Sequence, residues 1–500
     1  MPDAQYDVIV IGSGPGGATL AQSLAATGKR ILLIERGGYL PRAPANWDSQ
    51  TVFVDGAYQT KEVWYGGHGE SFSPGLHYFV GGNSKVYGAA LLRLRERDFG
   101  EVVHKHGVSP AWPQKSEAFE PYYAQAERLF HVHGVRGGDP NEPPSSGPFP
   151  HPPVSHEPRI QALSERLRGE GLHPFHLPLG ILLDEVEGKP APTSICIRCD
   201  AFDGFPCLLN GKADAQVICV DPALAAHANF TLMTDAYVSR LGTDPAGRVV
   251  TEVHVTRDGG EEILSADIVV VACGALSSAL LLLRSASDRH PDGLANGSGQ
   301  VGRNYMRHNQ SVLMALMREP NLTVFQKTLA ISDYYFSADD WPYPLGLIQM
   351  CGKAHADQIK GEALPGWLEW APEMPFEATA RHSLDFWLSS EDLPRPENRI
   401  FYDGERVRLD VAEGDMEGHR RLKDKLKLKQ ILTAADCHPV LMERSLYLGK
   451  KSPSAAPPTR PGPRALGPTR RRRCSISTAR PTNSTTSIWP TPASFPRSAR

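Results

Sequence analysis

Three glycines near the start of the chain stand at the spacing of a dinucleotide-binding turn. Gly12, Gly14 and Gly17 follow the apolar run of residues 8–11 in the string VIVIGSGPGG. At G-x-G-x-x-G spacing, glycines allow a tight turn, close approach of the backbone to a pyrophosphate, and close packing of the next helix on the strand. The N–H groups at the start of that helix then face the phosphates. The pattern predicts a dinucleotide site.

The segments around this turn form a matching unit. Residues 8–11 indicate a strand buried on both faces of a parallel sheet, residues 18–26 a helix, and residues 31–34 a second strand. Glu35 ends that strand about twenty residues beyond the loop, where a carboxylate can bind a ribose hydroxyl. A solvated acid at a strand end is the alternative for Glu35 taken alone. The order of strand, loop, helix, strand and acid favours nucleotide binding over a plain structural turn.

Length and composition limit the function further. The chain has 500 residues, enough for roughly two or three domains with a sizeable core. Its net charge of −3 argues against a nucleic-acid-binding protein, and no apolar run is long enough to cross a bilayer. Because the fingerprint begins almost at Met1, we expect no signal peptide and a cytoplasmic protein. Eight cysteines in a chain of this length do not make a disulfide scaffold.

A second glycine turn lies in the string FVGGNSKVYGAALLRLRERDF, residues 79–99. Gly81 and Gly82 form the turn, and Asn83 and Ser84 can cap a helix after it. The pattern predicts further elements at these places: a helix over 116–130, a linker or surface loop over 137–158, meander strands over 230–241 and 249–256, a buried strand over 268–273, a helix over 277–285, strands over 345–350 and 400–402, and a helix over 423–435.

With both glycine turns in view, the chain resembles the glucose–methanol–choline (GMC) family of flavin oxidoreductases over residues 6 to about 450. The resemblance is carried by the N-terminal fingerprint through Glu35, by GGNSKVYG at 81–88, by ACGALSSALLLLRS at 272–285, and by VGRNYMRH at 301–308. Asn83, Lys85 and Tyr87 depart from the commonest members, and Tyr87 stands where many members have Asn.

The resemblance implies an α/β fold with two parts. One is a doubly wound, Rossmann-like FAD-binding domain with a β-meander, and the other is an α+β substrate domain on an antiparallel sheet. We expect the FAD-binding domain over residues 1–304, with substrate-domain insertions, and the substrate-binding domain over 305–436. A return to the FAD domain is expected over 437–451, followed by an aberrant, disordered tail over 452–500.

The resemblance also implies the cofactor FAD and its contacts. The expected cofactor-binding residues are Gly12, Ser13, Gly14, Pro15, Gly16, Gly17, Glu35, Arg36, Gly81, Gly82, Asn83, Ser84, Tyr87, Tyr237, Val238, Cys273 and Gly274. The implied reaction oxidises a CH–OH group: a base removes the hydroxyl proton while the carbinol hydride moves to flavin N5. The expected partner is a small alcohol or sugar, with an electron acceptor that the sequence does not identify; neither nucleic acid nor a membrane is expected.

The base that the resemblance implies is a histidine after residue 450, with a second His or Asn beside it. Residues 452–500 contain no such motif, no Asp or Glu, and little hydrophobic periodicity. One interpretation is a basic disordered tail with Arg470–Arg473 as a nucleic-acid or localisation patch. We favour a shifted reading frame, because a one-nucleotide shift with GC-rich codons yields the strings HQAGT and DASFFPSIGA, which resemble the family's C-terminal sequence. No residue of this chain is therefore assigned as the catalytic base.

Four cysteines form a separate candidate site. Cys196 and Cys199 stand at C-x-x-C spacing, and Cys207 and Cys219 follow. Metal binding by thiolates is one hypothesis, and a redox pair or ordinary buried thiols are the alternatives. The later spacings fit no usual zinc or iron–sulfur pattern, so no metal is assigned. We expect Cys196 and Cys199 to lie close together in a loop that leads back into the FAD domain.

Two other functions compete with an active flavin enzyme. An NAD(P)-dependent dehydrogenase uses the same first fingerprint, although the second glycine turn argues against it. An inactive flavin-binding remnant is the other, and the missing base motif supports it.

Overall fold

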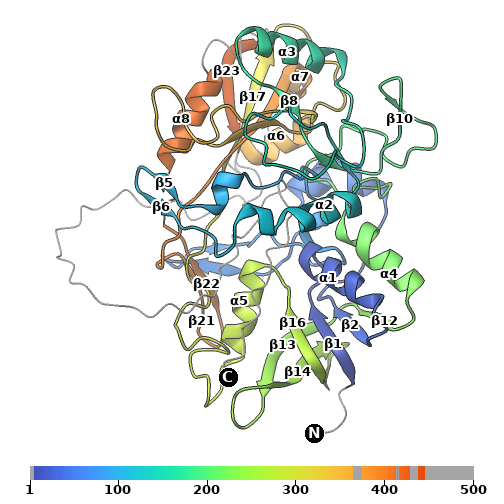
Figure 1. The fold of residues 1–500 in the computed structure, drawn as a ribbon, viewed down its shortest axis with the longest axis vertical. Helices are drawn as coiled ribbons and strands as arrows, with labels where there is room; N and C mark the ends of the chain where they lie inside the picture. The colour runs from blue at the N-terminus through green and yellow to red at the C-terminus, as the bar shows by residue number, and fades with distance from the viewer. Residues whose placement is uncertain (1–4, 364–373, 413, 415, 428–436, 445–500) are drawn as a thin grey trace, which may run out of the picture.

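The computed structural model describes residues 5–363, 374–412, 414, 416–427 and 437–444. Their elements form a lower half around a parallel sheet and an upper half around an antiparallel sheet (Figure 1). The predicted tail over 452–500 and most of the helix predicted over 423–435 lie outside the described residues. Within the described residues, no helix is both long enough and apolar enough to cross a bilayer.

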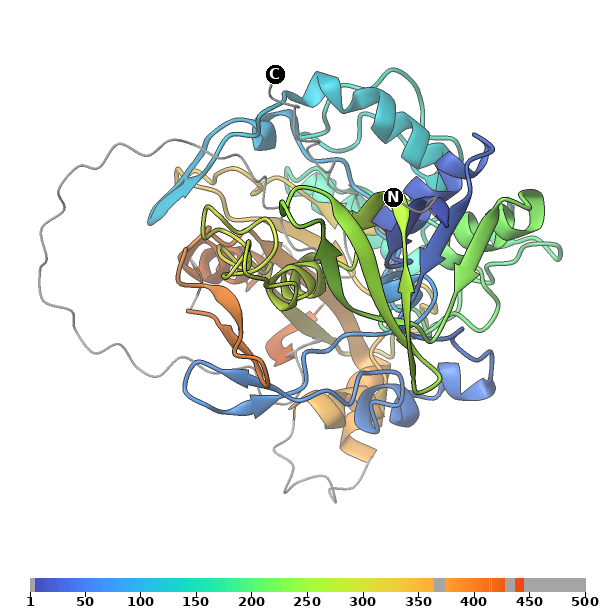
Figure 2. The ribbon, with the colours of Figure 1, turned by 90° about the horizontal axis from the view of Figure 1, so that it is seen from below.

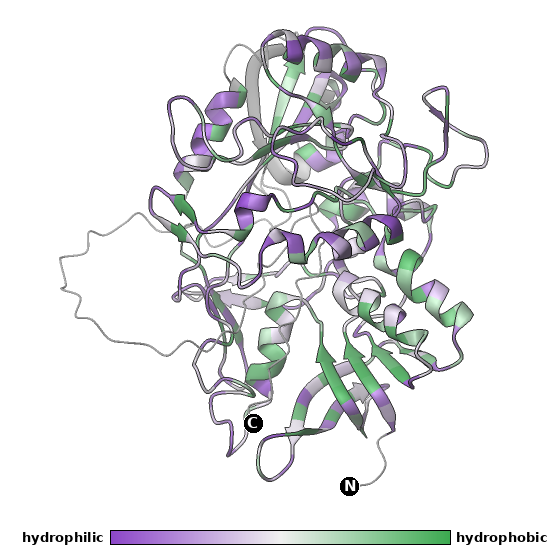
Figure 3. Cartoon of the chain, viewed as in Figure 1, coloured by the Kyte–Doolittle hydropathy of each residue, from purple (hydrophilic) through white to green (hydrophobic). Residues whose placement is uncertain are grey.

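The lower sheet has the strand order β12-β2-β1-β16, and each neighbouring pair is parallel. Val8 of β1 pairs with Ile31 of β2, and Ile11 pairs with Val271 of β16. A central strand with a helix layer on one face and the meander on the other needs apolar residues at successive positions, which explains the runs seen in the sequence. Figure 3 shows β1 and β2 as almost continuously hydrophobic. The bounds are β1 Tyr6–Ile11, β2 Ile31–Ile34, β12 Phe230–Met233 and β16 Ala266–Val271.

Helices follow two of these strands directly. Helix α1, Pro15–Ala25, starts three residues earlier than the predicted helix and buries Ala18, Ala21 and Ala25. Helix α5, Ala275–Arg284, follows β16. The small alanine side chains of α1 let the helix lie close to the sheet, as the glycine spacing predicts.

The predicted strand over 230–241 divides into two strands that belong to different sheets. Residues Phe230–Met233 join the lower sheet as β12, whereas β13, Tyr237–Thr243, pairs with β14, Val250–Arg257. The reason lies at Asp235, whose φ of 52° turns the chain out of the extended conformation. The meander is completed by β15, Gly260–Leu264. Figure 2 shows these green strands beside the blue N-terminal unit.

The upper sheet has the strand order β23-β17-β20-β19-β18-β8, and each neighbouring pair is antiparallel. Strand β8 comes from the long N-terminal part of the chain. Cys437–Arg444, which the sequence assigned to the return into the FAD domain, pairs as β23 with β17 in this sheet. The bounds are β8 Phe175–His176, β17 Asn309–Met317, β18 Leu329–Ile331, β19 Leu347–Met350, β20 Ser383–Ser390 and β23 Cys437–Arg444.

The two faces of the upper sheet contact different parts of the molecule. Ile348 and Leu388 pack on the outer face with helices α3, Pro158–Gly169, and α8, Met416–Lys427. Leu347 and Ala330 point the other way and share a core with Val10 of the lower sheet. Since neighbouring residues of a strand alternate between faces, positions 347 and 349 of β19 face the lower half.

The remaining elements connect or cover the two halves. Helix α8 begins at Met416, seven residues before the predicted start. The other helices and strands are β3 Trp64–Gly66, β4 Ser71–Phe72, β5 Val102–His104, β6 Gly107–Ser109, α2 Glu120–Leu129, β7 Val132–His133, β9 Leu179–Gly180, β10 Glu185–Val186, β11 Lys189–Pro190, α4 Asp221–Ala226, α6 Ala356–Ala363, α7 Met374–His382, β21 Arg399–Tyr402 and β22 Val407–Asp410.

Candidate functional site

The first glycine turn joins β1 to α1 under tight steric limits. Gly12 has a φ of +103°, and a Cβ there would lie 2.5 Å from the carbonyl oxygen of Ala272. A Cβ on Gly17 would lie 2.0 Å from the carbonyl oxygen of Gly12. A Cβ on Gly14, in contrast, would have no atom within 4 Å. Gly12 and Gly17 therefore serve the packing of strand and helix, while Gly14 faces open space.

The open space at Gly14 adjoins the start of α1. Gly14 is the N-cap residue of α1, no side chain caps this end, and Pro15 occupies the first turn. An uncapped helix start offers backbone N–H groups and the positive end of the helix dipole to an anion. These residues therefore fit the pyrophosphate of a dinucleotide cofactor.

Glu35 lies directly behind this turn. Its Oε2 atom accepts hydrogen bonds from the Ser13 backbone N (3.1 Å) and the Ser13 Oγ (2.6 Å), and its Oε1 accepts one from the Gly37 N (3.1 Å). Burial raises the pKa of the Glu35 carboxyl group, and the bonds from Ser13 and Gly37 partly offset this effect. A carboxylate has about four acceptor positions, so one remains for a ribose hydroxyl.

The second glycine turn touches the first. Gly81 (φ +96°) donates its backbone N–H to Ser13 Oγ at 3.0 Å, so Ser13 links the second turn to Glu35. A Cβ on Gly82 would lie 3.1 Å from the Cα of Gly14. The structure thus brings together two turns that are separated by almost seventy residues of sequence.

The next residues of the second turn are engaged within the protein. Ser84 Oγ donates to the Gly81 carbonyl oxygen (2.6 Å) and accepts from the Ala215 N (3.0 Å). Asn83 Oδ1 accepts from the His77 N at 3.2 Å. Tyr87 is buried and donates to the Ala213 carbonyl oxygen at 2.7 Å; its burial raises the pKa of its hydroxyl. These side chains shape the turn and leave its backbone as the surface for a cofactor.

Cys273 and Gly274 close the other side of the first turn. A Cβ on Gly12 would lie 2.9 Å from the Cα of Cys273. The Cys273 thiol donates to the Ile11 carbonyl oxygen at 3.3 Å, and burial raises its pKa to about 12. Gly274 has a φ of +79° and open space where a Cβ would stand. The thiol is a neutral packing group here, and the backbone at Gly274 is accessible.

The other predicted contacts have partners of their own. Arg36 lies between two rings, with its guanidinium 4.1 Å from the Tyr78 centroid and 4.5 Å from the Tyr237 centroid, and it pairs with Glu62. Val238 is buried in the core between the lower sheet and the meander. Arg36 and Tyr237 thus lie side by side, and the guanidinium of Arg36 is bound by Tyr78, Tyr237 and Glu62.

Sequence reasoning missed a group of buried charges under the second turn. Lys85 Nζ lies 2.9 Å from Asp214 Oδ2, and both side chains are at most 4% exposed. Lys327 pairs with Asp203, whose carboxylate occupies the space a side chain on Gly88 would need. The Lys85–Asp214 pair holds the 81–88 segment in place, because each of its charges loses its partner if the segment moves. The Lys327–Asp203 pair lies outside the segment and packs against Gly88. The one sequence signal was that Lys85 departs from the commonest members of the family.

A third lysine supports the same segment. Lys212 Nζ donates to the carbonyl oxygens of Tyr87 (2.8 Å) and Phe205 (2.9 Å), and also to that of Phe202. Full burial lowers the pKa of Lys212.

The candidate cysteine site consists of reduced thiols. Cys207 lies near enough to Cys196 and Cys199 to contribute to the raised pKa of both thiols, and Cys196 contributes to that of Cys199. Burial raises the pKa of Cys196 to about 11 and that of Cys199 to about 12, so these thiols are protonated and weakly reactive at neutral pH. No group of three or more metal-ligating side chains occurs among the residues that the structure describes.

A cavity of about 230 Å³ lies in the upper half, apart from the glycine turns. Its wall includes residues 92–95, which continue from the second turn, together with α2 and the ends of β19 and β20. His419 of α8 also lines it, but both ring nitrogens are held by serines: Ser311 Oγ at 3.0 Å and Ser390 Oγ at 2.9 Å. Burial lowers the pKa of His419 to about 3, so the ring is neutral at physiological pH.

Comparison with known protein families identifies two parts of the chain, one with the first glycine turn and one with the meander, α5 and the VGRNYMRH segment. Residues 5–44 match the model described as "FAD binding domain", and residues 184–310 match the model described as "GMC oxidoreductase". The chain belongs to the GMC oxidoreductase family. Its cofactor is FAD, because residues 5–44 match an FAD-binding model, and this match argues against the NAD(P) alternative.

Curated relatives from bacteria support the same assignment. The chain is 34% identical to 6'''-hydroxyparomomycin C oxidase of Streptomyces lividus and 32% identical to paromamine 6'-oxidase of Streptomyces fradiae, in each case over 67% of this chain and 62% of the relative. It is 29% identical to 2-methyl-1,2-propanediol dehydrogenase of Mycolicibacterium austroafricanum, over 63% of this chain and 57% of the relative. The chain thus spans about three fifths of the length of these relatives.

Solved structures confirm the predicted α/β fold. Pyridoxine 4-oxidase from Mesorbium loti superimposes with a TM-score of 0.52 at 18% identity, covering 86% of this chain and 80% of that one. The R554A variant of formate oxidase from Aspergillus oryzae RIB40 gives a TM-score of 0.55 at 14% identity, covering 91% and 85%.

Proposed function

We propose that this protein oxidises the CH–OH group of a small alcohol or sugar with FAD as the electron acceptor. The observation that carries the proposal is the contact between the two glycine turns at Ser13 and Gly14, beside the uncapped start of α1. Three relatives support the type of reaction, since they are named as oxidases or a dehydrogenase of hydroxyl compounds.

In this proposal the residues of the lower half bind and orient the cofactor. The N–H groups at the start of α1 bind the pyrophosphate, and Glu35 binds a ribose hydroxyl through its remaining acceptor position. The backbone of Gly81 and Gly82 limits the position of the cofactor from the other side. Bound FAD supplies a two-electron acceptor for the hydride of the carbinol carbon.

The proton acceptor is not assigned to any described residue. His419 is a poor candidate, because both its nitrogens are bonded to serine hydroxyls and its pKa is lowered to about 3. The resemblance places the base after residue 450, where the sequence has no matching motif. We therefore propose that this exact chain turns over slowly.

A second candidate function, an inactive flavin-binding remnant, follows from the same sequence feature. It predicts full binding of FAD without reduction by any alcohol. A shifted reading frame near the codon for Lys451 would explain the missing motif. Sequencing the DNA around that codon tests this explanation directly.

The experiment compares this chain with a version in which the frame is restored by one nucleotide. Both proteins are purified, their flavin content is read from the absorption spectrum, and dye reduction is measured over a panel of primary alcohols and sugars. We expect flavin in both and rapid dye reduction in the restored chain alone. The proposal fails if the restored chain contains flavin but reduces dye with no member of the panel, or if neither chain retains flavin.

A further inference from the structure

The cavity of the upper half lies on the face of the upper sheet that points toward the lower half. Gln349 of β19 lines it, and so does Ser389 of β20, which pairs opposite Leu347. Leu347 belongs to the core shared with the lower sheet, so Gln349 and Ser389 lie on that same face. Other parts of the wall, residues 92–95 and 306–308, directly follow the second glycine turn and the G-R-N segment.

Several side-chain atoms of this wall have no hydrogen-bond partner among the described residues, and neutral groups of Gln349, Ser389 and Trp341 are among them. The side chain of Gln349 is fully buried, and both its amide nitrogen and its amide oxygen are unsatisfied. The hydroxyl of Ser389 and the indole N–H of Trp341 are unsatisfied as well. A buried polar group without a hydrogen-bond partner costs about 1–3 kcal/mol of stability. A side chain with two such atoms therefore indicates that a bound molecule completes its hydrogen bonds.

The charged groups of the wall are, in contrast, already engaged. Arg93 pairs with Glu127 at 2.7 Å and Lys105 with Glu417 at 2.9 Å. Asp98 accepts a hydrogen bond from Tyr335 at 3.0 Å, Glu391 accepts one from Ser109 at 2.6 Å, and Asp392 accepts one from the Leu393 N at 2.9 Å.

One wall cation differs from these. Arg307 lines the cavity, and no ion pair is recorded for it within the described part of the chain. A positively charged ligand would therefore meet an unneutralised cation and carboxylates that already accept bonds. Besides this guanidinium, the groups left for a ligand are neutral donors and acceptors: an amide, a hydroxyl and an indole N–H.

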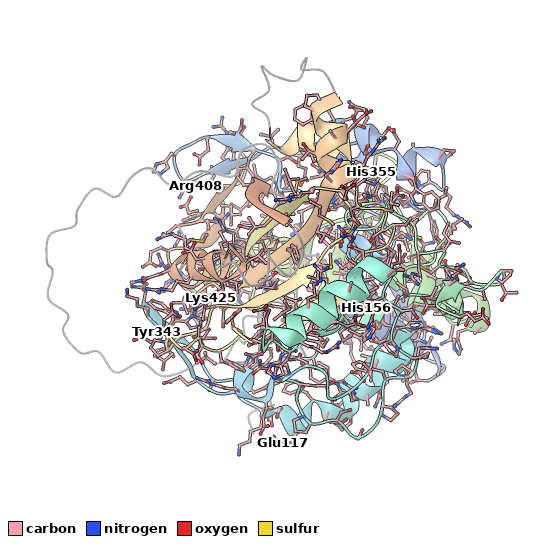
Figure 4. All side chains as sticks on the ribbon, turned by 90° about the horizontal axis from the view of Figure 1, so that it is seen from above. Glu117, His156, Tyr343, His355, Arg408 and Lys425 are labelled. Carbon is pink, nitrogen blue, oxygen red and sulfur yellow. The ribbon has the colours of Figure 1, made fainter. Side chains whose placement is uncertain are left out.

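Size and aromatic content narrow the ligand further. A volume of about 230 Å³ lies below the range of about 300–1,000 Å³ that is usual for drug-sized ligands, so the cavity suits a single small ring. Trp341 and Tyr343 lie 5.3 Å apart, centroid to centroid, and offer rings for the apolar face of such a ligand. Tyr343, labelled in Figure 4, precedes β19 in the chain.

We propose that Gln349 is a specificity-determining residue that binds neighbouring hydroxyl groups of a single-ring polyol without a positive charge in this cavity, with Ser389 and Trp341 as additional donors. This inference rests on the proposed function, because it names the substrate class of that reaction. It distinguishes this chain's substrate from amino sugars, because an amino sugar would bring a second cation into a wall that already holds the unneutralised Arg307.

The test measures binding by the full-length protein with its FAD in the oxidised state, by calorimetry. The probes are D-glucose, D-glucosamine and D-glucuronate, which share ring and size but differ in charge. We expect D-glucose to bind more tightly than D-glucosamine, and D-glucuronate to measure the effect of Arg307, which can pair with its carboxylate. Gln349→Leu, which keeps the volume but removes the amide, should weaken D-glucose binding about tenfold, the equivalent of two hydrogen bonds of about 0.7 kcal/mol each.

Matched variants separate this effect from a general loss of structure. Gln310 of β17 pairs opposite Ser389 and has an unsatisfied amide nitrogen, but it is not part of the cavity wall. Gln310→Leu should therefore leave D-glucose binding unchanged. Ser389→Ala should weaken binding about threefold, the equivalent of one such bond. If Gln349→Leu does not fold, as judged by thermal unfolding, the Ser389→Ala and Gln310→Leu pair decides.

Two kinds of result would overturn the inference. One is tighter binding of D-glucosamine than of D-glucose, or no binding of D-glucose at all. The other is unchanged D-glucose binding in folded Gln349→Leu, or in Ser389→Ala. Because binding is read without turnover, failure of the proposed function shows differently: D-glucose would bind with Gln349 dependence, yet no alcohol or sugar would reduce the flavin of the frame-restored chain.

Discussion

The lower and the upper sheet differ in what they present to the site, backbone in one and side chains in the other, and their residue patterns differ accordingly. In the lower sheet, successive residues such as Val8, Ile9 and Val10 are all buried, because both faces are covered. In the upper sheet, β19 also has only buried residues, yet Gln349 lies among them with both amide atoms unsatisfied. The lower sheet is thus a scaffold whose contribution is the backbone at its glycine turns, whereas the upper sheet presents side chains.

This contrast assigns the two halves different sensitivities. A change in the lower half should act through backbone geometry and buried charge, and it should affect cofactor retention and stability. A change on the inner face of the upper sheet should act on the ligand with little effect on the fold. The predictions below test that division, from the largest expected effect to the smallest.

The largest effect should come from the sequence after residue 450. Restoring the reading frame by one nucleotide near the codon for Lys451 should increase alcohol-dependent dye reduction by roughly 10²–10⁴-fold, the usual contribution of a general base. Steady-state kinetics on the two purified proteins measure it. An ordinary enzymatic rate from the chain as printed would contradict this prediction.

Buried charge should matter far more in the lower half than exposed charge in the upper half. Lys85→Met leaves Asp214 buried and without its cation, which should reduce the free energy of unfolding by about 3 kcal/mol, near the low end of the range for broken buried pairs. The low end applies because two backbone N–H groups, of Gln216 and Val217, still donate to Asp214.

The control for this variant is an exposed pair. Lys425 of α8 pairs with Asp340, which is 60% exposed, so Lys425→Met should cost less than about 1 kcal/mol. Urea unfolding of both variants measures the difference. Equal losses in the two variants would show that burial is not the deciding factor.

The upper half should lose stability in acid through His419. Burial lowers its pKa from 6.5 to about 3. Below pH 6.5 the imidazole is therefore protonated in the unfolded chain but stays neutral in the folded protein. This contribution to stability is present at neutral pH and is lost as the pH falls from 6.5 towards 3. At pH 5 the loss should be about 2 kcal/mol.

A double comparison isolates this histidine from the others. His419→Gln should make the decrease in stability between pH 7 and pH 5 smaller by about 2 kcal/mol than in the wild type. His68→Gln, at an exposed position, should leave the decrease unchanged. Thermal or urea unfolding as a function of pH gives the values, and an identical slope in His419→Gln and the wild type would refute the assignment.

The smallest effect on the fold should come from Gly14, with a clear effect on the cofactor. A side chain there enters open space, so Gly14→Leu should leave the unfolding free energy of the apoprotein nearly unchanged while it blocks the pyrophosphate. FAD affinity should fall by at least about tenfold, or about 1.4 kcal/mol. Gly147→Leu, also at an open position, should retain FAD like the wild type. A full flavin spectrum in Gly14→Leu would exclude the pyrophosphate site.

Much of the lower half could be predicted because its signals are local. The strands over 8–11 and 31–34 and the turn at Gly12 are each fixed by a few adjacent residues, and the structure has them where the patterns predict. Helix α1 follows the turn as predicted, but it starts at Pro15, three residues before the predicted start. The division of 230–241 at Asp235 was missed, because nothing in the apolar pattern shows that a residue in the left-handed region interrupts the strand.

The candidate site shows the same limit at longer range. Gly81 and Gly82 were predicted beside the cofactor, but the hydrogen bond from Gly81 to Ser13, and from Ser13 to Glu35, depends on packing across 68 positions of sequence. Asp214 lies 129 positions from Lys85, and no spacing rule connects them. Contacts of this kind arise when sheets and loops pack, and single-sequence patterns carry no record of them.

The sequence by itself determined the nucleotide unit, because its glycine spacing, apolar runs and terminal acid all lie within one continuous segment, residues 8–35. It also determined that the family's base motif is missing after residue 450. The tertiary structure alone decided which polar side chains of the upper sheet are left without partners, since Gln349 and Ser389 look like ordinary strand residues until register and burial place them on one cavity wall. The physical reason is that unsatisfied hydrogen bonding is a property of the surroundings of an atom, which only the packed chain defines.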